Sequence, residues 1–444
     1  MTTNTTMTGT PTAAAVLAAA PPIRRVPGAR ERIRAGNVAA GRRIAILDDD
    51  PTGSQTVHDV AIVLALDDLR LAGDTTFFLT NTRSLPEAEA AALTERVARA
   101  LFEQDPAVEI VSRSDSTLRG HVTAEVEAID RARRAVLGNG YDGVLLVPAF
   151  FEAGRFTRDD VHWAGDVPVG ETEFARDATF GYRSSNLREF VAEKRGDVPT
   201  RSLSLEDIRA GRSAERLADA SGWVVVNAEG YDDLDAVVEG VRASGRSFVY
   251  RTGPSFVRAL AGIAPIDPLG AADIWPDGRP DGHGLVVVGS HVGLTTRQVE
   301  AVQGLREFEL DVNALDPAAV GAQVREALEH DDVLVYTSRT LKGGGLKTAR
   351  EVSAAVTEVV QAALGAHPAW VIAKGGITSH DVAVKGLGIR RATVLGQLLP
   401  GMVSVFRPQD ADERAVGVPY VVFAGNVGDE RTLAEIVERF RGAA

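Results

Sequence analysis

The chain has 444 residues, 45% of them hydrophobic, and its 61 acidic residues outnumber 48 basic ones to give a net charge of -13 at pH 7. This length exceeds one ordinary core and predicts two domains, while the negative charge argues against nucleic acid as a partner. The lack of cysteine excludes disulfides, thiolate metal sites and a cysteine nucleophile, and the eight histidines include no H-x-x-x-H pair.

Residues 1–40 are expected to form a flexible or loosely helical tail. The apolar stretch 13–20 is too short to span a bilayer, and no basic residue precedes it as a signal peptide requires. No later segment reaches the length of a membrane span, so we expect a cytoplasmic protein without a membrane partner.

From Arg43 onward, short β-branched runs alternate with longer helical stretches, which predicts an α/β fold. In the first half we predict strands at 43–48, 60–66, 75–80, 108–112, 143–148, 223–227 and 247–251, and helices at 86–103, 120–136, 186–195, 231–243 and 254–262. After a Pro-, Gly- and Asp-rich stretch, we predict strands at 284–289, 308–312, 332–337, 369–374, 391–395 and 419–424, and helices at 295–304, 316–330, 346–364 and 429–440. The predicted domains are 41–265 and 284–444 with a linker over 266–283, each a largely parallel sheet flanked by helices, with a ligand cleft between them.

Three carboxylates, Asp48, Asp49 and Asp50, follow the first predicted strand. Adjacent carboxylates repel one another, which favours a bound cation or a bound hydroxyl donor, and one of them could accept a proton from a substrate hydroxyl. The alternative is a solvated turn in which Asp50 caps a helix after Pro51. The sequence does not choose among the three carboxylates.

Hydroxyl, carboxylate and arginine side chains follow two further strands of the first half. Asp115 and Ser116 can hydrogen-bond a polyol, and Arg119 can grip a carboxylate through two parallel hydrogen bonds. Arg155 lies just beyond the strand predicted at 143–148. These side chains suit a sugar acid, whereas the alternatives are a Ser/Asp helix cap and a surface loop.

Three small-residue turns follow strands of the second half, at 289–293, 374–378 and 423–428. Backbone N–H groups in such turns can bind an anion, and we expect Gly376 to adopt a positive φ and to let a phosphate approach the backbone. The segment 343–348 is not a P-loop, because Leu346 stands where that motif requires glycine; we expect a loop there that acts as a lid.

In order and spacing, these motifs resemble the four-carbon acid sugar kinase family over about residues 43–430. The matching segments are 48–56, 80–84, 115–120, 148–155, 289–298 and 374–379. The resemblance implies an N-terminal domain that binds the sugar acid and a C-terminal domain that binds ATP. The implied reaction places phosphate on a hydroxyl of a threonate-, erythronate- or 3-oxo-tetronate-like acid, with ATP and Mg²⁺ as cofactors.

The resemblance also assigns expected site residues. The catalytic candidates are Asp48, Asp49 and Asp50; the substrate contacts are Arg83, Asp115, Ser116, Arg119 and Arg155; the ATP contacts are Ser290, Gly375, Gly376, Ile377, Thr378 and Gly425. Metal ligands are not predicted. Val292 and Ala424 stand where relatives often have serine, so phosphate contacts there would come from backbone N–H groups. Ile377 replaces a residue that is often acidic, which makes a metal-linked role there doubtful.

Two other classes of function compete with this interpretation. A non-catalytic sugar-acid-binding or regulatory protein of the same fold would bind ligand without ATP turnover. A nicotinamide-dependent oxidoreductase is disfavoured, because no strand is followed by G-x-G-x-x-G with an acidic residue about twenty positions later. The expected partners are therefore the sugar acid and ATP, and a homodimer is kept as a hypothesis.

Overall fold

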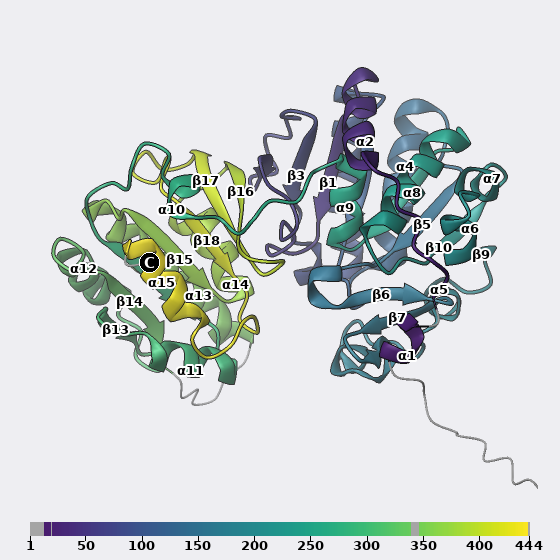
Figure 1. The fold of residues 1–444 in the computed structure, drawn as a ribbon. Helices are drawn as coiled ribbons and strands as arrows, with labels where there is room; N and C mark the ends of the chain where they lie inside the picture. Colours follow the sequence, from purple (N-terminus) through teal and green to yellow (C-terminus); the bar gives the residue numbers. More distant parts are fainter. Residues whose placement is uncertain (1–12, 19, 339–345, 443–444) are drawn as a thin grey trace, which may run out of the picture. The chain divides into compact units, whose positions relative to one another are not determined.

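The computed structural model describes residues 13–18, 20–338 and 346–442, without the side chains of residues 15 and 346–349. The chain forms two compact units, and Figure 1 labels many of their helices and strands. Unit 1 comprises residues 1–40, 85–102 and 110–262, and unit 2 comprises residues 41–84, 103–109 and 263–444. Residues 41–84 thus group with the C-terminal half of the chain rather than with the rest of the predicted first domain, and the domain boundaries stay a prediction.

Unit 1 is built on a parallel sheet with the strand order β4-β11-β5-β10-β9. A small antiparallel sheet, β6-β7-β8, follows β5 in the chain. The strands are β4 (Glu109–Arg113), β5 (Gly143–Val147), β6 (Arg155–Arg158), β7 (Val161–Ala164), β8 (Val167–Pro168), β9 (Thr200–Leu203), β10 (Gly222–Val226) and β11 (Phe248–Thr252). The helices are α3 (Glu87–Gln104), α4 (Val122–Leu137), α5 (Leu187–Arg195), α6 (Leu205–Arg209), α7 (Ser213–Leu217), α8 (Tyr231–Ser244) and α9 (Pro254–Ala261), with 3₁₀ turns η2 (Phe151–Ala153), η3 (Val169–Glu171) and η4 (Glu173–Arg176).

The stretch expected to be a tail contains two helices, α1 (Ala13–Ala18) and α2 (Ala29–Ala39). Helix α2 packs against α8 and α9, and its Arg30 forms an ion pair with Asp235 at 2.7 Å. Ala13 of α1 lies in a small apolar cluster with Phe156 and Trp163 of the three-stranded sheet. Contacts with distant residues therefore give this stretch more structure than its own sequence predicts.

Unit 2 is built on a mixed sheet with the strand order β13-β14-β12-β15-β18-β17-β16-β2-β3-β1. The neighbours in the run β13-β14-β12-β15-β18 are parallel to one another. Strand β17 pairs antiparallel with β18 and forms an antiparallel hairpin with β16, and β16 pairs antiparallel with β2. The strands are β1 (Ile44–Asp48), β2 (Val60–Val63), β3 (Thr75–Leu79), β12 (Gly284–Val288), β13 (Arg306–Leu310), β14 (Val333–Thr337), β15 (Trp370–Lys374), β16 (Arg391–Leu399), β17 (Val403–Asp410) and β18 (Tyr420–Phe423). The helices are α10 (Ala271–Ile274), α11 (Gly293–Ala301), α12 (Pro317–Ala327), α13 (Leu346–Ala363), α14 (Gly376–Asp381) and α15 (Thr432–Arg441), with the short turns η1 (Thr82–Ser84), η5 (Leu364–Ala366) and η6 (Val382–Gly386).

Continuous apolar runs explain several buried strands of unit 2. Every residue of β1, β12, β15 and β18 is buried, as expected for parallel strands that are covered on both faces. The α/β prediction is confirmed, and each predicted strand and helix has a counterpart. The antiparallel hairpin partner β17, the strand β9 and the three-stranded sheet were not predicted.

Candidate active site

The acidic turn leaves the carboxyl end of β1 and folds back over its own first carboxylate. The side chains of Asp48 and Asp49 are buried, and Asp50 is partly exposed. A side chain at Gly53 would lie 1.9 Å from a carboxylate oxygen of Asp48, so only glycine lets the turn close in this way. Asp50 accepts a hydrogen bond from the backbone N–H of Thr52 at 2.9 Å, but no helix follows, so Asp50 is not a helix cap.

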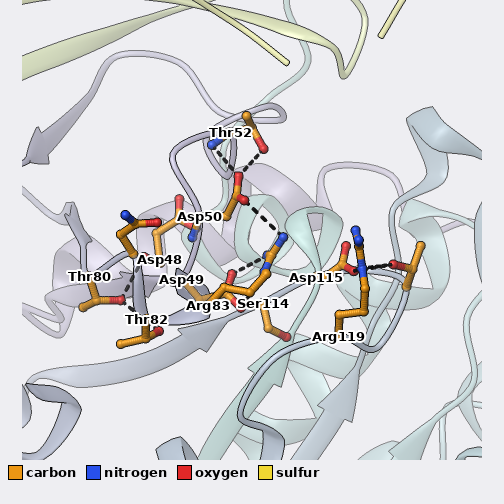
Figure 2. Close-up of polar contacts among 12 residues, drawn as sticks. Asp48, Asp49, Asp50, Thr52, Thr80, Thr82, Arg83, Ser114, Asp115 and Arg119 are labelled. Carbon is orange, nitrogen blue, oxygen red and sulfur yellow. Dashed lines mark hydrogen bonds and ion pairs between the residues drawn. The ribbon is translucent and has the colours of Figure 1, made fainter. Parts of the chain in front are cut away.

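Arg83 holds two of the three carboxylates together. Its guanidinium donates to both carboxylate oxygens of Asp49, at 2.6 and 3.3 Å, and to Asp50 at 3.2 Å. Figure 2 shows the guanidinium between these carboxylates. The backbone N–H of Thr80 donates to the carbonyl of Asp48 at 2.9 Å, which fixes the turn after β3 against the acidic turn. Arg83, expected as a substrate contact, therefore also neutralises the carboxylates.

The acidic turn also contacts the C-terminal half of unit 2. The hydroxyl of Ser54 lies 3.3 Å from that of Ser404 on β17. Burial lowers the pKa of His380 on α14, while the negative charges of Asp381 and Asp50 act in the opposite direction. Asp50 is thus close enough to act electrostatically on α14, the helix that begins at the glycine turn.

Three strand-end turns of unit 2 meet around Ser290. Thr295 donates from its hydroxyl to the carbonyl of Gly425 at 2.8 Å and lies 3.3 Å from the hydroxyl of Ser290. A side chain at Gly425 would lie 2.5 Å from the Ser290 hydroxyl, and one at Gly289 would lie 2.3 Å from the Thr378 hydroxyl. Ser290, Thr378 and Gly425, three of the expected ATP contacts, therefore lie close together, and their role in binding ATP stays a prediction.

The expectation of a positive φ at Gly376 is wrong, because the positive φ belongs to its neighbour. Gly375 has a φ of 118° and would bring a side chain to 3.1 Å from both Ser290 and Thr378. Gly376 begins α14, and a side chain there would meet nothing within 4 Å. Gly375 makes the turn, and Gly376 leaves open space in front of the first N–H groups of the helix.

The positions that depart from the family pattern have two different environments. Val292 and Ile377 are exposed, with 46% and 73% of their surface accessible, so neither hydrophobic side chain is part of the core. The side chain of Ile377 projects from the first turn of α14. The carbonyl of Ala424 accepts a hydrogen bond from Lys374. The segment 343–345, expected to belong to a lid, lies outside the described residues.

In unit 1, two arginines gather beside one aromatic ring. Arg119 donates to Asp115 at 2.6 Å and lies 5.0 Å from the centre of the Phe174 ring. Arg155 lies 5.8 Å from the same centre. Burial lowers the pKa of Arg155, and the nearby Asp115 opposes this shift while Arg119 adds to it. Three expected substrate contacts are therefore brought together, and Asp115 is no helix cap because α4 begins only at Val122.

Two residues that sequence reasoning missed hold this cluster in place. His162 contacts the carbonyl of Ser116 through Nε2 at 2.8 Å and the hydroxyl of Thr157 through Nδ1 at 2.9 Å. Tyr182 donates to the carbonyl of Thr117 at 2.7 Å. Both come from residues 155–182, a stretch of short strands and turns without a hydrophobic period, so no sequence signal marked them.

The described residues do not form a ready metal site. Within 13–18, 20–338 and 346–442 there is no group of three His, Asp or Glu side chains placed to hold a metal ion. In the acidic turn, the Arg83 guanidinium already neutralises Asp49 and Asp50. A preformed Mg²⁺ cage does not fit this arrangement. In that same described part, no helix has the length and apolar character needed to cross a membrane.

Two family models match the chain in succession. Residues 44–260 match the sugar-binding N-terminal domain, and residues 285–433 match the nucleotide-binding C-terminal domain. The chain is 18% identical to a Haemophilus influenzae protein of known structure, with a TM-score of 0.65, and 16% identical to one from Salmonella typhimurium, with a TM-score of 0.72. Each match covers 90% of this chain and 99% of the other, and at these identities they show the fold alone.

Curated relatives are named as kinases of four-carbon acids. The chain is 29% identical to the D-threonate kinase of Bordetella bronchiseptica, over 82% of this chain and 85% of that one. It is 28% identical to the D-threonate kinase of Salmonella typhimurium and 30% identical to the D-erythronate kinase of Heliobacterium modesticaldum. These two matches cover 58% and 60% of this chain and only 60% and 61% of the relatives. With both domain models matched in order, the chain belongs to the four-carbon acid sugar kinase family.

Proposed function

We propose that this protein is an ATP-dependent kinase that phosphorylates a hydroxyl of a four-carbon sugar acid such as threonate, erythronate or a 3-oxo-tetronate. The names of the relatives and the nucleotide-binding domain model support this proposal. The structural observation that carries it is the meeting of three strand-end turns around Ser290, where Thr378 and Gly425 lie close together and backbone N–H groups can bind phosphate. The carboxylates of the acidic turn, which are suited to proton transfer, belong to the same unit.

Phosphoryl transfer requires the protein mainly to position the two reactants and to neutralise the charge of the phosphates. The backbone N–H groups at Gly375 to Thr378, together with the turns at Ser290 and Gly425, would hold the phosphates of ATP. The close contacts among Ser290, Thr295 and Gly425 keep these turns in fixed positions before the nucleotide arrives. Mg²⁺ would accompany the phosphates of ATP, which is how this ion commonly enters kinases.

The cluster in unit 1 would recognise the acid. Arg155 has no ion pair within 4 Å among the described residues, and its Nε is buried without a hydrogen-bond partner there. A substrate carboxylate would supply that partner. Arg119 is held by Asp115, which would fix the angle of its guanidinium, while Asp115 and Ser116 would bind hydroxyls of the acid.

Among the three carboxylates, the surroundings favour Asp50 as the general base. Asp48 is buried beneath Gly53, and Asp49 is buried and held by two donors of Arg83. Asp50 is the partly exposed carboxylate of the three. A base must come within hydrogen-bond reach of the hydroxyl that it deprotonates, so the exposed carboxylate has the advantage. Arg83 would then set the position of Asp50 and contact the acid as well.

The test is an ADP-release assay with a panel of four-carbon acids: both enantiomers of threonate and of erythronate, and the 3-oxo-tetronates. We expect ADP release that depends on one acid, with the phosphorylated acid identified by ³¹P NMR. Binding of the acid without ADP release from ATP would support the alternative, a non-catalytic sugar-acid-binding protein. Release of ADP that is the same with and without every acid would contradict both.

A further inference from the structure

A fully buried lysine ends the central strand β15, directly before the glycine turn. None of the surface of Lys374 is accessible, and its Nζ donates to the carbonyl of Ala424 at 3.0 Å. The Nζ atom also lies 3.6 Å from the centre of the Phe423 ring. Among the described residues, no carboxylate forms an ion pair with it. Lys374 is therefore a buried cation that is held by a carbonyl and an aromatic face.

Burial of an unpaired ammonium group opposes folding, because the group loses its hydration. This loss alone lowers the pKa of Lys374 to about 7. A methionine could occupy similar space without losing hydration. The lysine therefore lowers the stability of the protein without ligand. A bound anion would be attracted by its positive charge.

The contacts of Lys374 reach both turns that are expected to bind phosphate. Lys374 and Phe423 pair in register between β15 and β18, and the N–H of Gly375 donates to the carbonyl of Phe423 at 2.8 Å. Ala424 and Gly425 continue directly from β18. The Lys374 ammonium thus fixes the start of the turn 424–428 while its own backbone leads into the glycine turn.

Other titratable groups on the neighbouring elements interact with partners other than Lys374. On α14, His380 interacts electrostatically with Asp381, Lys385 and Asp50, whereas burial is the sole cause of the pKa shift of Lys374. His291, after β12, lies 3.5 Å from a hydroxyl of β14. Asp429 accepts hydrogen bonds within its own turn. The charge of Lys374 is therefore not neutralised by these groups.

We propose that Lys374 is a positioning residue for the nucleotide: its positive charge holds the turn 424–428 against the glycine turn and attracts the phosphate that both turns bind. Because the side chain is buried, it acts through the turns and through space rather than by touching the ligand. This inference rests on the proposed kinase function and adds a residue to its ATP site.

A pH dependence follows from this role by linkage. A bound phosphate stabilises the protonated lysine, so nucleotide binding raises the pKa of Lys374 above its value of about 7 in the empty protein. Nucleotide affinity is then highest below that value, and it falls as pH rises through it, because the empty protein must regain a proton to bind well.

The test compares Lys374→Met with the wild type and with Lys385→Met, which removes an exposed lysine on the segment after α14. ADP alone is titrated calorimetrically from about pH 6 to about pH 9, and the melting temperature of each empty protein is measured. We expect Lys374→Met to bind ADP about tenfold more weakly or worse at the acid end. Its affinity should vary less with pH, and its melting temperature should match or exceed that of the wild type. Lys385→Met loses only the ion pair of an exposed lysine with Asp381, so it should keep the wild-type ADP affinity and pH slope.

Equal ADP affinity and an equal pH slope in Lys374→Met would overturn the inference, as would weaker binding accompanied by a lower melting temperature. If the methionine variant does not fold, Lys374→Gln, which keeps a donor for the Ala424 carbonyl, is judged by the same pH slope. Failure of the wild-type protein to bind ADP at any pH would instead refute the proposed kinase function.

Discussion

Three adjacent aspartates in the acidic turn have three different environments. Asp48 is buried and covered by the turn at Gly53, Asp49 is buried and held by two donors of Arg83, and Asp50 is partly exposed. Neighbours in the sequence therefore differ in access to a substrate. The structure therefore predicts different effects for the three Asp→Asn substitutions, whereas the sequence did not choose among the three carboxylates.

We predict that Asp50→Asn lowers kcat by about 10² to 10⁴ while the protein folds normally and binds the acid. Asparagine keeps the acceptor for the Thr52 N–H but cannot accept the proton of the attacking hydroxyl. The measurement is kcat in the ADP-release assay, with the melting temperature and acid affinity of each variant.

The two neighbouring variants serve as matched controls. Asp49→Asn removes the charge that holds Arg83, so it should raise KM for the acid and lower stability more than Asp50→Asn does. Asp48→Asn should act mainly on stability, since its carboxylate is buried. Near-normal kcat in all three variants would remove the carboxylates from catalysis, and collapse in Asp49→Asn alone would move the base to that residue.

Arg155→Lys should raise KM for the sugar acid at least tenfold and leave KM for ATP nearly unchanged. A lysine ammonium cannot reproduce two parallel hydrogen bonds to a carboxylate, nor the stacking of a guanidinium near Phe174. Steady-state kinetics with each substrate varied in turn provides the measurement. Arg183→Lys, at a side chain that is 89% exposed, is the control. Equal changes in both KM values would indicate a structural role for Arg155.

At the scale of elements, the two glycines of the turn before α14 have different structural roles. Gly375 adopts a backbone conformation that other residues rarely adopt, and Gly376 has open space around it. We predict that Gly375→Ala costs about 1 to 3 kcal/mol of stability, because it strains the backbone. Gly376→Val should leave the melting temperature nearly unchanged but abolish tight ADP binding, because its side chain would fill the space that a phosphate needs.

Thermal melting and ADP titration of these two variants, side by side, separate the two roles. If Gly376→Val binds ADP as the wild type does, phosphate does not approach that part of the turn. If Gly375→Ala melts at the wild-type temperature, the positive φ is not a constraint on the fold.

The elements that could be predicted from the sequence are those with a strong local period or a long apolar run. Strands such as β12 and β15 and the amphipathic helix α3 were predicted to within two residues, because their burial follows directly from composition. The sheet β6-β7-β8 was missed, because its strands are short and lie between turns that carry no period. Its His162 supports the cluster at Asp115 through contacts between residues far apart in the sequence, which no motif in one segment can reveal.

At the scale of the whole molecule, a buried histidine ties stability to pH. Burial lowers the pKa of His162 to about 4 from an ordinary value of 6.5, because the neutral ring is favoured in the folded state. Its contribution to stability is complete above pH 6.5 and is lost as pH falls toward 4. The difference amounts to about 3 kcal/mol of unfolding free energy.

We therefore expect the wild type to lose more stability between pH 7 and about pH 4.5 than His162→Gln, whose amide can still donate to the Ser116 carbonyl. Urea midpoints at the two pH values measure this difference. His330→Gln, at an exposed site, should follow the wild type. Identical losses in all three proteins would show that His162 does not control acid stability.

The antiparallel pairing of β16 with β2 bears on how the chain is synthesised. Residues 391–394 supply the neighbour of β2 that completes its hydrogen bonding on the side away from β3. Until the ribosome has released those residues, β2 presents an unpaired edge, and open strand edges invite pairing with other chains. The nascent protein thus carries an association-prone edge through most of its translation, and a fragment that ends at the predicted linker would keep that edge permanently.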